Sequence, residues 1–177
     1  MDDGEPRPAE ETAVYGFLEG LGIAYGRVAH APADTMEVCA AISRELGAAI
    51  CKNLFLTNRQ QTDYYLLMMP GDKPFKTKDL SRQIGAARLS FAGPEAMWEF
   101  LRIRPGAVSV LGLMNDSACR VRLLIDREVA EGEFVGCHPC VNTATLRLAV
   151  RDLMEKFLPA TAHAPTLVDL PRYPNGL

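Results

Sequence analysis

Two of the five cysteines, Cys137 and Cys140, form a Cys-x-x-Cys motif that could carry redox or metal chemistry. A redox dithiol needs a following helix N-terminus to lower the thiol pKa, and a zinc site needs a second pair of ligands. The motif stands late in the chain after an expected strand, with no clear helix behind it, and the other cysteines (Cys39, Cys51 and Cys119) are scattered singly. We therefore interpret all five as reduced thiols, and we predict no metal site.

Histidine is the side chain best suited to move protons near neutral pH, and the chain has three. His138 is the strongest candidate, because a glycine and a proline restrict the backbone near it and Asn142 follows closely. His30 stands at the end of an expected strand before Ala31-Pro32, where completing a turn is the alternative role. His163 lies in a proline-rich segment and is expected to be solvated.

Lys52 is a charged residue inside the mostly apolar segment 50–57, which is expected to be an interior strand. A lysine there either extends from the strand edge into water or points into a cleft as a partly desolvated ammonium. In the second case it could hold an anionic or ester oxygen.

The segment 105–113 has glycines at Gly106 and Gly112 with Ser109 between them. Glycines let a backbone approach a ligand closely, and exposed N–H groups there could bind an oxyanion. The segment matches neither a dinucleotide fingerprint nor a phosphate-binding loop, so we expect no nucleotide cofactor. Ser109 is not in a Gly-x-Ser-x-Gly elbow, so a serine hydrolase triad has no support.

The spacing of apolar residues predicts the elements that position these groups. Helices are expected from Val14 to Leu21, from Asp34 as an N-cap to Leu46, from Thr77 as a cap to Ile84, and after Gly93-Pro94. Strands are expected over 23–29, 50–57, 64–69, 87–91, 121–126 and 134–137, with 50–57 and 64–69 forming a hairpin. The segment 143–158 fits either one long helix or a strand to Leu148 with a helix from about Val150. This order predicts a mixed sheet flanked by helices.

The chain of 177 residues, 48% of them hydrophobic, has the length of one domain with a real core. We expect an acidic flexible leader over 1–11, a single domain over 12–158, and a proline-rich tail over 159–177 that is draped or disordered. The leader is neither a signal nor a transit peptide. No apolar run approaches the ~18–20 residues that span a bilayer. These features predict a cytoplasmic protein without a membrane partner.

The net charge of −3 does not identify a partner, because the acidic excess is confined to the leader. Without residues 1–11, the chain has 18 basic and 17 acidic residues, so its body is near neutral. Net charge therefore excludes no partner, nucleic acid included, and suggests none.

Five short motifs in a fixed order resemble the YbaK/ProX superfamily of aminoacyl-tRNA deacylases, in particular its free-standing prolyl-tRNA-synthetase-associated editing proteins. They span about Val14 to Leu158 and are His30-Ala31-Pro32 with Thr35 and Glu37, Cys51-Lys52-Asn53-Leu54-Phe55-Leu56, Asp72-Lys73-Pro74-Phe75, Gly106 to Asp116, and Gly136-Cys137-His138-Pro139 with Asn142 to Leu146. The resemblance implies an α+β, YbaK-like fold with a mixed, mostly antiparallel sheet flanked by helices. It also implies that 143–148 is a strand. Val110 departs from the pattern, since relatives usually carry proline there.

The function implied by this resemblance is trans-editing, which is hydrolysis of the ester of a mischarged tRNA, with alanine on proline tRNA as the expected substrate. Such proteins are thought to need neither a cofactor nor a nucleophilic side chain. By the same resemblance, Lys52 anchors the terminal adenosine with Asn53 nearby, and His138 orients the aminoacyl end or its water. The catalytic set is Lys52, His138, Gly112 and Ser109, and the substrate-binding set is His30, Asn53, Gly106 and Asn142.

Two alternatives stay open within the same fold: a deacylase for another small amino acid such as cysteine or serine, and a non-catalytic protein that binds tRNA or a synthetase. The expected partner is the acceptor end of an aminoacyl-tRNA, and prolyl-tRNA synthetase is a possible second partner. A basic patch could hold the tRNA or could be an ordinary solvated face. Its members are Lys52, Lys73, Lys76, Lys78, Arg82 and Arg88.

Overall fold

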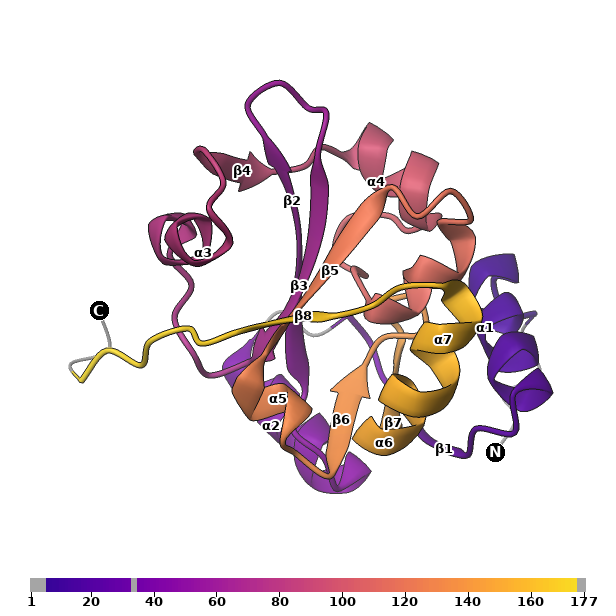
Figure 1. Ribbon diagram of the computed structural model, residues 1–177. Coiled ribbons are helices and arrows are strands. Elements are labelled where there is room, and N and C mark those ends of the chain that lie inside the picture. The colour runs from indigo at the N-terminus through magenta and orange to yellow at the C-terminus, as the bar shows by residue number, and fades with distance from the viewer. Residues whose placement is uncertain (1–5, 33–34, 175–177) are drawn as a thin grey trace.

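The computed structural model describes residues 6–32 and 35–174 and contains two β-sheets with helices packed around them (Figure 1). The larger sheet has the strand order β4-β2-β3-β5-β8, and the smaller has the order β1-β7-β6. The strands are β1 Tyr25–Ala29, β2 Cys51–Asn58, β3 Tyr64–Pro70, β4 Leu89–Phe91, β5 Val121–Asp126, β6 Phe134–Cys137, β7 Ala144–Ala149 and β8 Thr166–Val168. Four of the six strand pairings are antiparallel, which confirms the expected mixed, mostly antiparallel α+β fold.

The helices cover the sheets from several sides, with α3 on the side of β4 and α1 beside the yellow C-terminal helical segment (Figure 1). Their bounds are α1 Ala9–Gly20, α2 Met36–Leu46, α3 Thr77–Ile84, α4 Pro94–Leu101, the 3₁₀-helix η1 Val110–Asn115, α5 Arg127–Ala130, α6 Val150–Asp152, the π-helical turn η2 Leu153–Phe157 and α7 Leu158–Thr161. Pro94 occupies the first turn of α4, as expected for a residue whose missing N–H has no partner there anyway.

The expected hairpin is confirmed: β2 pairs with β3 in antiparallel register, from Cys51 opposite Pro70 to Thr57 opposite Tyr64. β5 then pairs with β3 in parallel. The strands predicted over 121–126 and 134–137 are present as β5 and β6.

The ambiguous segment 143–158 is a strand followed by helix, as the family resemblance implied. β7 forms the centre of the smaller sheet, where it pairs with β1 and β6. The chain turns helical at Val150 and stays so to Thr161. The strand reading prevails because Ala144, Leu146 and Leu148 alternate into the core with 0–1% exposure.

The two faces of β2 belong to two different apolar cores. Phe55 packs into the large core, which also includes residues of α1, α4, η1 and the smaller sheet. Leu54 and Leu56 pack into a second core beneath α3, which includes Leu80. Since side chains alternate along a strand, Asn53 lies on the face of Phe55, and Lys52 lies on the face of Leu54.

The helix caps differ in detail from the expected ones. Thr35 caps α2, its side-chain oxygen accepting a hydrogen bond from the backbone N–H of Val38 at 3.2 Å. The expected cap, Asp34, lies outside the described residues. Thr77 is the first residue of α3 instead of its cap, which is Lys76.

The first helix begins at Ala9, inside the segment expected to be a flexible leader. Glu11 is only 2% exposed. Its carboxylate accepts hydrogen bonds from the Tyr15 hydroxyl at 2.5 Å and from Arg27 Nη2 at 2.9 Å. This buried network fixes α1 to β1, so residues 9–11 are part of the folded domain.

The C-terminal segment is ordered over its described part, which corrects the alternative of a disordered tail and the expected solvation of His163. Residues 166–168 form β8, an edge strand parallel to β5. His163, expected to be solvated, is 6% exposed, and its Nε2 lies 2.9 Å from Asp116 Oδ2. The proline-rich composition suggested exposure, but a long-range carboxylate partner holds the imidazole inside.

Lys73 is also corrected, because it is buried and is not part of a basic surface. Its side chain is 2% exposed, and its Nζ donates hydrogen bonds to Asp126 Oδ2 and to the Leu170 carbonyl, each at 2.8 Å. Glu128 Oε1 lies 3.3 Å away. Lys73 therefore ties the C-terminal segment to β5, and it cannot contact a nucleic acid.

Candidate functional site

His30 and His138 lie side by side, their ring centroids 6.1 Å apart, although they are far apart in the sequence. β1 ends at Ala29, just before His30, and pairs with β7, while His138 directly follows β6 on the other side of β7. The three-stranded sheet thus places both imidazoles at the same end of the sheet, after the two strands that flank β7. This pairing of two predicted site residues is the centre of the candidate site.

His138 presents one free nitrogen. Its Nδ1 lies 2.9 Å from the carbonyl oxygen of Ala144, and a carbonyl only accepts, so Nδ1 carries the proton. Nε2 has no hydrogen-bond partner among the described residues. Burial lowers the pKa of His138, the nearby His30 lowers it further, and the Ala144 carbonyl opposes them in part. At neutral pH the free Nε2 therefore presents a lone pair.

His30 is held by both of its ring nitrogens. Nδ1 lies 2.8 Å from the Ala31 carbonyl, and Nε2 lies 2.7 Å from Oγ1 of the fully buried Thr145. In its neutral form, His30 donates from Nδ1 and accepts from the Thr145 hydroxyl. Because both ring nitrogens have fixed partners, His30 can shape the site but has little freedom to transfer protons. Thr145 was not predicted as a site residue, although it belongs to one of the motifs quoted above.

Asn53 connects β2 to the glycine-containing loop. Its Oδ1 accepts a hydrogen bond from the backbone N–H of Val110 at 3.1 Å, and Val110 is the first residue of η1. An asparagine on the inner face of β2 thus fixes the start of η1. Valine in place of the expected proline at position 110 makes this hydrogen bond possible, because proline has no N–H to donate to Asn53.

Ser109 and Gly112 are both buried, Ser109 with a hydrogen bond to the backbone of η1 and Gly112 in close packing against Ile103 and Leu101. The Ser109 hydroxyl caps η1 by accepting from Leu111 N at 3.2 Å. A Cβ on Gly112 would lie 2.6 Å from Ile103 Cδ1 and 3.2 Å from the Leu101 carbonyl oxygen. Both residues therefore set the shape of the loop through packing and capping.

Gly106 and Asn142 lie next to each other on the exposed side of this loop. Gly106 has φ = +92°, a conformation that other residues rarely adopt. A Cβ at Gly106 would lie 3.6 Å from Asn142 Nδ2. This contact joins the loop before η1 to the β6–β7 connection, which also carries His138.

Lys52 lies on the opposite face of β2 from Asn53, at the end of the strand where Ile50 forms a bridge with Gly136 of β6. Its Nζ donates a 2.8 Å hydrogen bond to the Lys73 carbonyl. Burial lowers the pKa of Lys52, and the charge of Asp72 partly opposes this shift. The side chain lies at one end of a groove, which we call the Lys52 groove, formed by Lys52, Leu54, Phe75, Lys76, Thr77, Lys78 and Phe91.

The predicted site residues therefore form two groups. One contains the paired His30 and His138, and it is linked through the β6–β7 connection to Asn142, Gly106 and the η1 loop with Asn53. The other is Lys52 with its groove. The alternation of β2 puts Asn53 and Lys52 on different faces, and this could have been read from the two-residue period of the strand. Phe75 and Phe91 in the groove were not predicted as site residues, although Phe75 belongs to one of the motifs quoted above.

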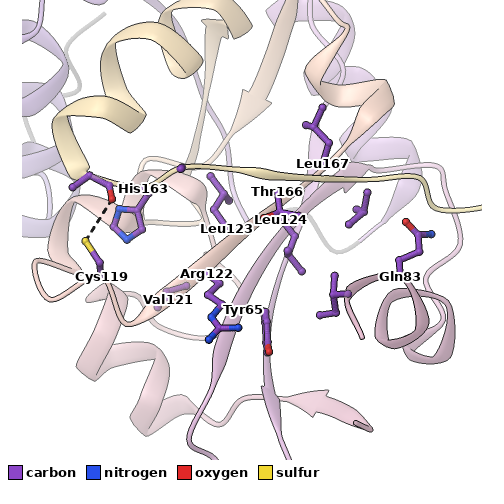
Figure 2. A pocket seen from close by; sticks show the side chains of 14 residues that line it. Tyr65, Gln83, Cys119, Val121, Arg122, Leu123, Leu124, His163, Thr166 and Leu167 are labelled. Carbon is purple, nitrogen blue, oxygen red and sulfur yellow. Dashed lines mark hydrogen bonds between the residues drawn. The ribbon is translucent and has the colours of Figure 1, made fainter. Parts of the chain in front are cut away.

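A second pocket lies between β5, β8 and α3, with Cys119 and His163 at one end and Gln83 at the other (Figure 2). None of the eight predicted site residues is among the described residues that line it. Its His163 is already paired with Asp116. It is therefore not the predicted site.

The cysteines are not arranged for redox or metal chemistry. All five are free thiols, and burial raises the pKa of Cys51, Cys137 and Cys140 to about 12 in each case. No group of three or more potential metal ligands occurs among residues 6–32 and 35–174.

We expect a thiol reagent such as iodoacetamide to modify the native protein at Cys119 and, more slowly, at Cys39. Cys119 is exposed and Cys39 is half-buried, whereas the raised pKa of the other three keeps them protonated and unreactive. Mass spectrometry of tryptic peptides after native labelling checks this. Rapid labelling of Cys137 in folded protein would contradict the assignment.

Comparison with known proteins shows which family the chain belongs to. The sequence profile of the aminoacyl-tRNA editing domain matches residues 30–156. The chain is 33% identical over 158 residues to the prolyl-tRNA editing protein ProX of Acetoanaerobium sticklandii, covering 89% of this chain and 96% of that protein. It is 32% identical over 154 residues to prolyl-tRNA synthetase associated domain-containing protein 1 of Danio rerio, covering 86% and 83%.

Solved structures agree on the fold. One, described as a candidate trans-editing enzyme for prolyl tRNA synthetase, superposes with a TM-score of 0.68 at 20% identity and covers 94% of this chain and 100% of its own. The fold and the sequence matches together define an aminoacyl-tRNA editing domain. The chain belongs to the YbaK/ProX family, as its motifs implied. Within the described residues, no helix is long and apolar enough to cross a membrane.

Proposed function

We propose that this protein is a trans-editing deacylase that hydrolyses proline tRNA mischarged with alanine, Ala-tRNA(Pro). The observation that best supports the proposal is the free Nε2 of His138, a neutral imidazole nitrogen held by the Ala144 carbonyl beside His30. The relatives named for prolyl-tRNA editing supply the choice of tRNA. A synthetase cannot exclude a smaller side chain by fit alone, since a methylene is worth only ~1–3 kcal/mol, so a second hydrolytic site is needed.

The reaction needs only water and an oriented ester. A water oxygen forms a bond to the ester carbonyl carbon, the bond from that carbon to the ribose 3′ oxygen breaks, and the ribose oxygen takes up a proton. Holding the ester and the water together supplies much of the rate enhancement. In our proposal, His138 Nε2 accepts a hydrogen bond from the attacking water or from the substrate, and it thereby orients that group.

The loop that begins η1 would shape the pocket for the aminoacyl side chain. Asn53 and Ser109 hold its first turn through hydrogen bonds to Val110 N and Leu111 N. These two bonds occupy the N–H groups of Val110 and Leu111, so in our proposal the first turn contributes a fixed shape and not free backbone donors. A small, fixed pocket would accept alanine and exclude the prolyl ring.

The decisive experiment incubates the full chain with alanyl-tRNA and prolyl-tRNA, both on proline tRNA, and follows release of the amino acid. Rapid loss of alanine with prolyl-tRNA spared is the expected result. Cysteinyl and seryl esters on the same tRNA then test the alternative deacylases. If no ester is cleaved faster than in buffer while the tRNA still binds, the protein is a non-catalytic binding module.

The pH dependence tests the role of His138. Because burial lowers its pKa below the ordinary 6.5, the lone pair on Nε2 is present above that pH and is lost as pH falls through the lowered value. We expect the ratio of catalysed to buffer hydrolysis to stay level from pH 8 to 6.5 and to fall below that. A His138→Gln variant, which cannot titrate, is expected to be slower and to lack the acid limb. If the rate of the His138→Gln variant still fell at acid pH, the titrating group would be another residue.

A further inference from the structure

The end of the described chain returns to the neighbourhood of the Lys52 groove. After β8, the yellow C-terminal segment continues toward the side of the molecule that carries α3 (Figure 1). We call its residues 169–173 the C-terminal strap. The strap lies outside residues 30–156, the part of the chain that matches the editing domain. The family assignment therefore gives no reason for the contacts that the strap makes.

The path of the strap is fixed before its last two residues. The backbone N–H of Asp169 donates a 2.7 Å hydrogen bond to Gln83 Oε1 on α3. The carboxylate of Asp169 accepts a 2.9 Å hydrogen bond from Arg127 Nε on α5. The strap is thus held between α3 and the turn that follows β5, and its final residues emerge beside the segment that leads from β3 to α3.

Arg172 of the strap bonds two carboxylates from different parts of the chain. Its Nη2 lies 2.6 Å from Glu128 Oε2 and 3.3 Å from Asp72 Oδ1. Its Nε also donates to the Glu128 carboxylate. A guanidinium can hold two carboxylates at once, because it has five N–H donors in a fixed planar arrangement. Arg172 therefore sets the direction of the Asp72 side chain.

Tyr173 makes the corresponding contact at the other end of the segment 72–79. Its hydroxyl donates a hydrogen bond to Asp79, which lies in the first turn of α3. Lys76 Nζ lies 3.9 Å from the centroid of its ring. The strap thus engages the carboxylates at both ends of the segment that supplies residues 75–78 to the Lys52 groove.

Asp72 is the carboxylate best placed to compete for Lys52. It directly precedes Lys73, whose carbonyl accepts the 2.8 Å hydrogen bond from Lys52 Nζ. The charge of Asp72 also raises the pKa of Lys52 against the larger, opposite effect of burial. The Asp72 side chain is 73% exposed, so without Arg172 it would be free to turn toward the ammonium. A lysine paired in this way must give up that partner before it binds another oxygen.

We propose that Arg172 and Tyr173 are positioning residues for deacylation. Arg172 holds Asp72 and Tyr173 holds Asp79, so both carboxylates stay on the strap and away from the lysines of the groove. Within the described part of the chain, Lys52 then has no ion-pair partner and keeps its ammonium for the substrate. This inference rests on the proposed function and gives a role to a segment outside the matched domain.

The test measures KM and kcat for alanyl-tRNA with the full chain. Arg172→Ala is expected to raise KM about fivefold with kcat nearly unchanged, because it weakens binding and leaves the chemical step intact. The variant should fold, since exposed ion pairs contribute little to stability, and thermal unfolding checks this. Arg151→Ala is the matched control, because it removes another exposed arginine, paired with Glu155 on the far helical segment. Its KM should equal that of the wild type.

Rescue separates positioning from a merely structural role. Adding Asp72→Asn to Arg172→Ala removes the competing charge and is expected to restore KM to within about twofold of the wild type. In a Lys52→Ala background, Arg172→Ala should have no further effect, whereas an independent structural defect would multiply the loss. A wild-type KM in Arg172→Ala would overturn the proposal, and so would a raised KM that Asp72→Asn does not restore. The proposed function stands in both cases.

A titration of Lys52 by nuclear magnetic resonance tests the strap without any enzyme activity. Arg172→Ala is expected to raise the pKa of Lys52, because a freed Asp72 carboxylate favours the charged ammonium. The double variant with Asp72→Asn should lose this rise. If the wild type cleaves no ester but the pKa of Lys52 rises in this way, the proposed function fails while the strap still controls Lys52. An unchanged pKa in Arg172→Ala would overturn the strap proposal whether or not the protein is a deacylase.

Discussion

Replacing Lys73 with alanine is expected to lower the free energy of unfolding by about 3–5 kcal/mol, the usual cost of removing one partner from a buried ion pair. Lys73 Nζ bonds the Asp126 carboxylate and the Leu170 carbonyl at 2.8 Å each. Asp126 is 1% exposed, so its charge would remain inside without its lysine and would keep only backbone N–H donors, from Glu128 and Leu170. Urea unfolding followed by circular dichroism measures the change.

The same experiment separates a structural lysine from a surface one. Lys78 stands five residues further along and is exposed, so Lys78→Ala is expected to alter stability by no more than about 0.5 kcal/mol. Folded Lys73→Ala should retain deacylase activity, because the Lys52 side chain bonds the main-chain carbonyl of residue 73, which alanine keeps. If Lys73→Ala lost little stability but much deacylase activity, Lys73 would be a substrate-binding residue and not a structural one.

Local patterns were sufficient to predict much of the fold. The β2–β3 hairpin is marked by two apolar runs around a polar turn, and α4 is marked by Gly93-Pro94. Both depend on neighbours in the sequence, which is why they could be predicted from spacing alone.

The features that were predicted wrongly depend on partners far away in the sequence. Glu11 is buried because Arg27 neutralises it, and His163 is buried because Asp116 accepts its hydrogen bond. The C-terminal segment is ordered partly because Arg172 bonds Glu128, which lowers the pKa of that carboxyl to about 2. Charge and proline content favour exposure in each case, and only the tertiary structure supplies the compensating partner.

The candidate site was predicted from the order of its motifs, and its geometry was not. His30 and His138 come together because β1 and β6 both pair with β7, a topology that no local pattern contains. Lys52 and Asn53 are adjacent in the sequence, yet they face different sides of the sheet. The structure thus places the candidate residues Asn53 and Lys52 on opposite faces of β2.

Lys52→Ala is expected to reduce kcat/KM for deacylation by at least about tenfold while leaving the fold intact. The ammonium is partly desolvated, as its lowered pKa indicates, and in that setting a charge interacts more strongly with an anionic or ester oxygen than it does in water. Because Lys52 makes its hydrogen bond to a main-chain carbonyl and has no ion-pair partner within the described residues, its removal leaves no buried charge unpaired. The measurement is single-turnover deacylation of alanyl-tRNA, with thermal unfolding as the check on folding.

Two further variants decide what the lysine does. Lys52→Arg keeps the charge but replaces a compact ammonium with a planar fork, and it is expected to recover only part of the activity. Lys156→Ala removes an exposed lysine that pairs with Asp152 on the far helical segment, and it should deacylate like the wild type. If Lys52→Ala also deacylates at a near-normal rate, Lys52 does not hold the substrate, and catalysis rests on the His138 side of the sheet alone.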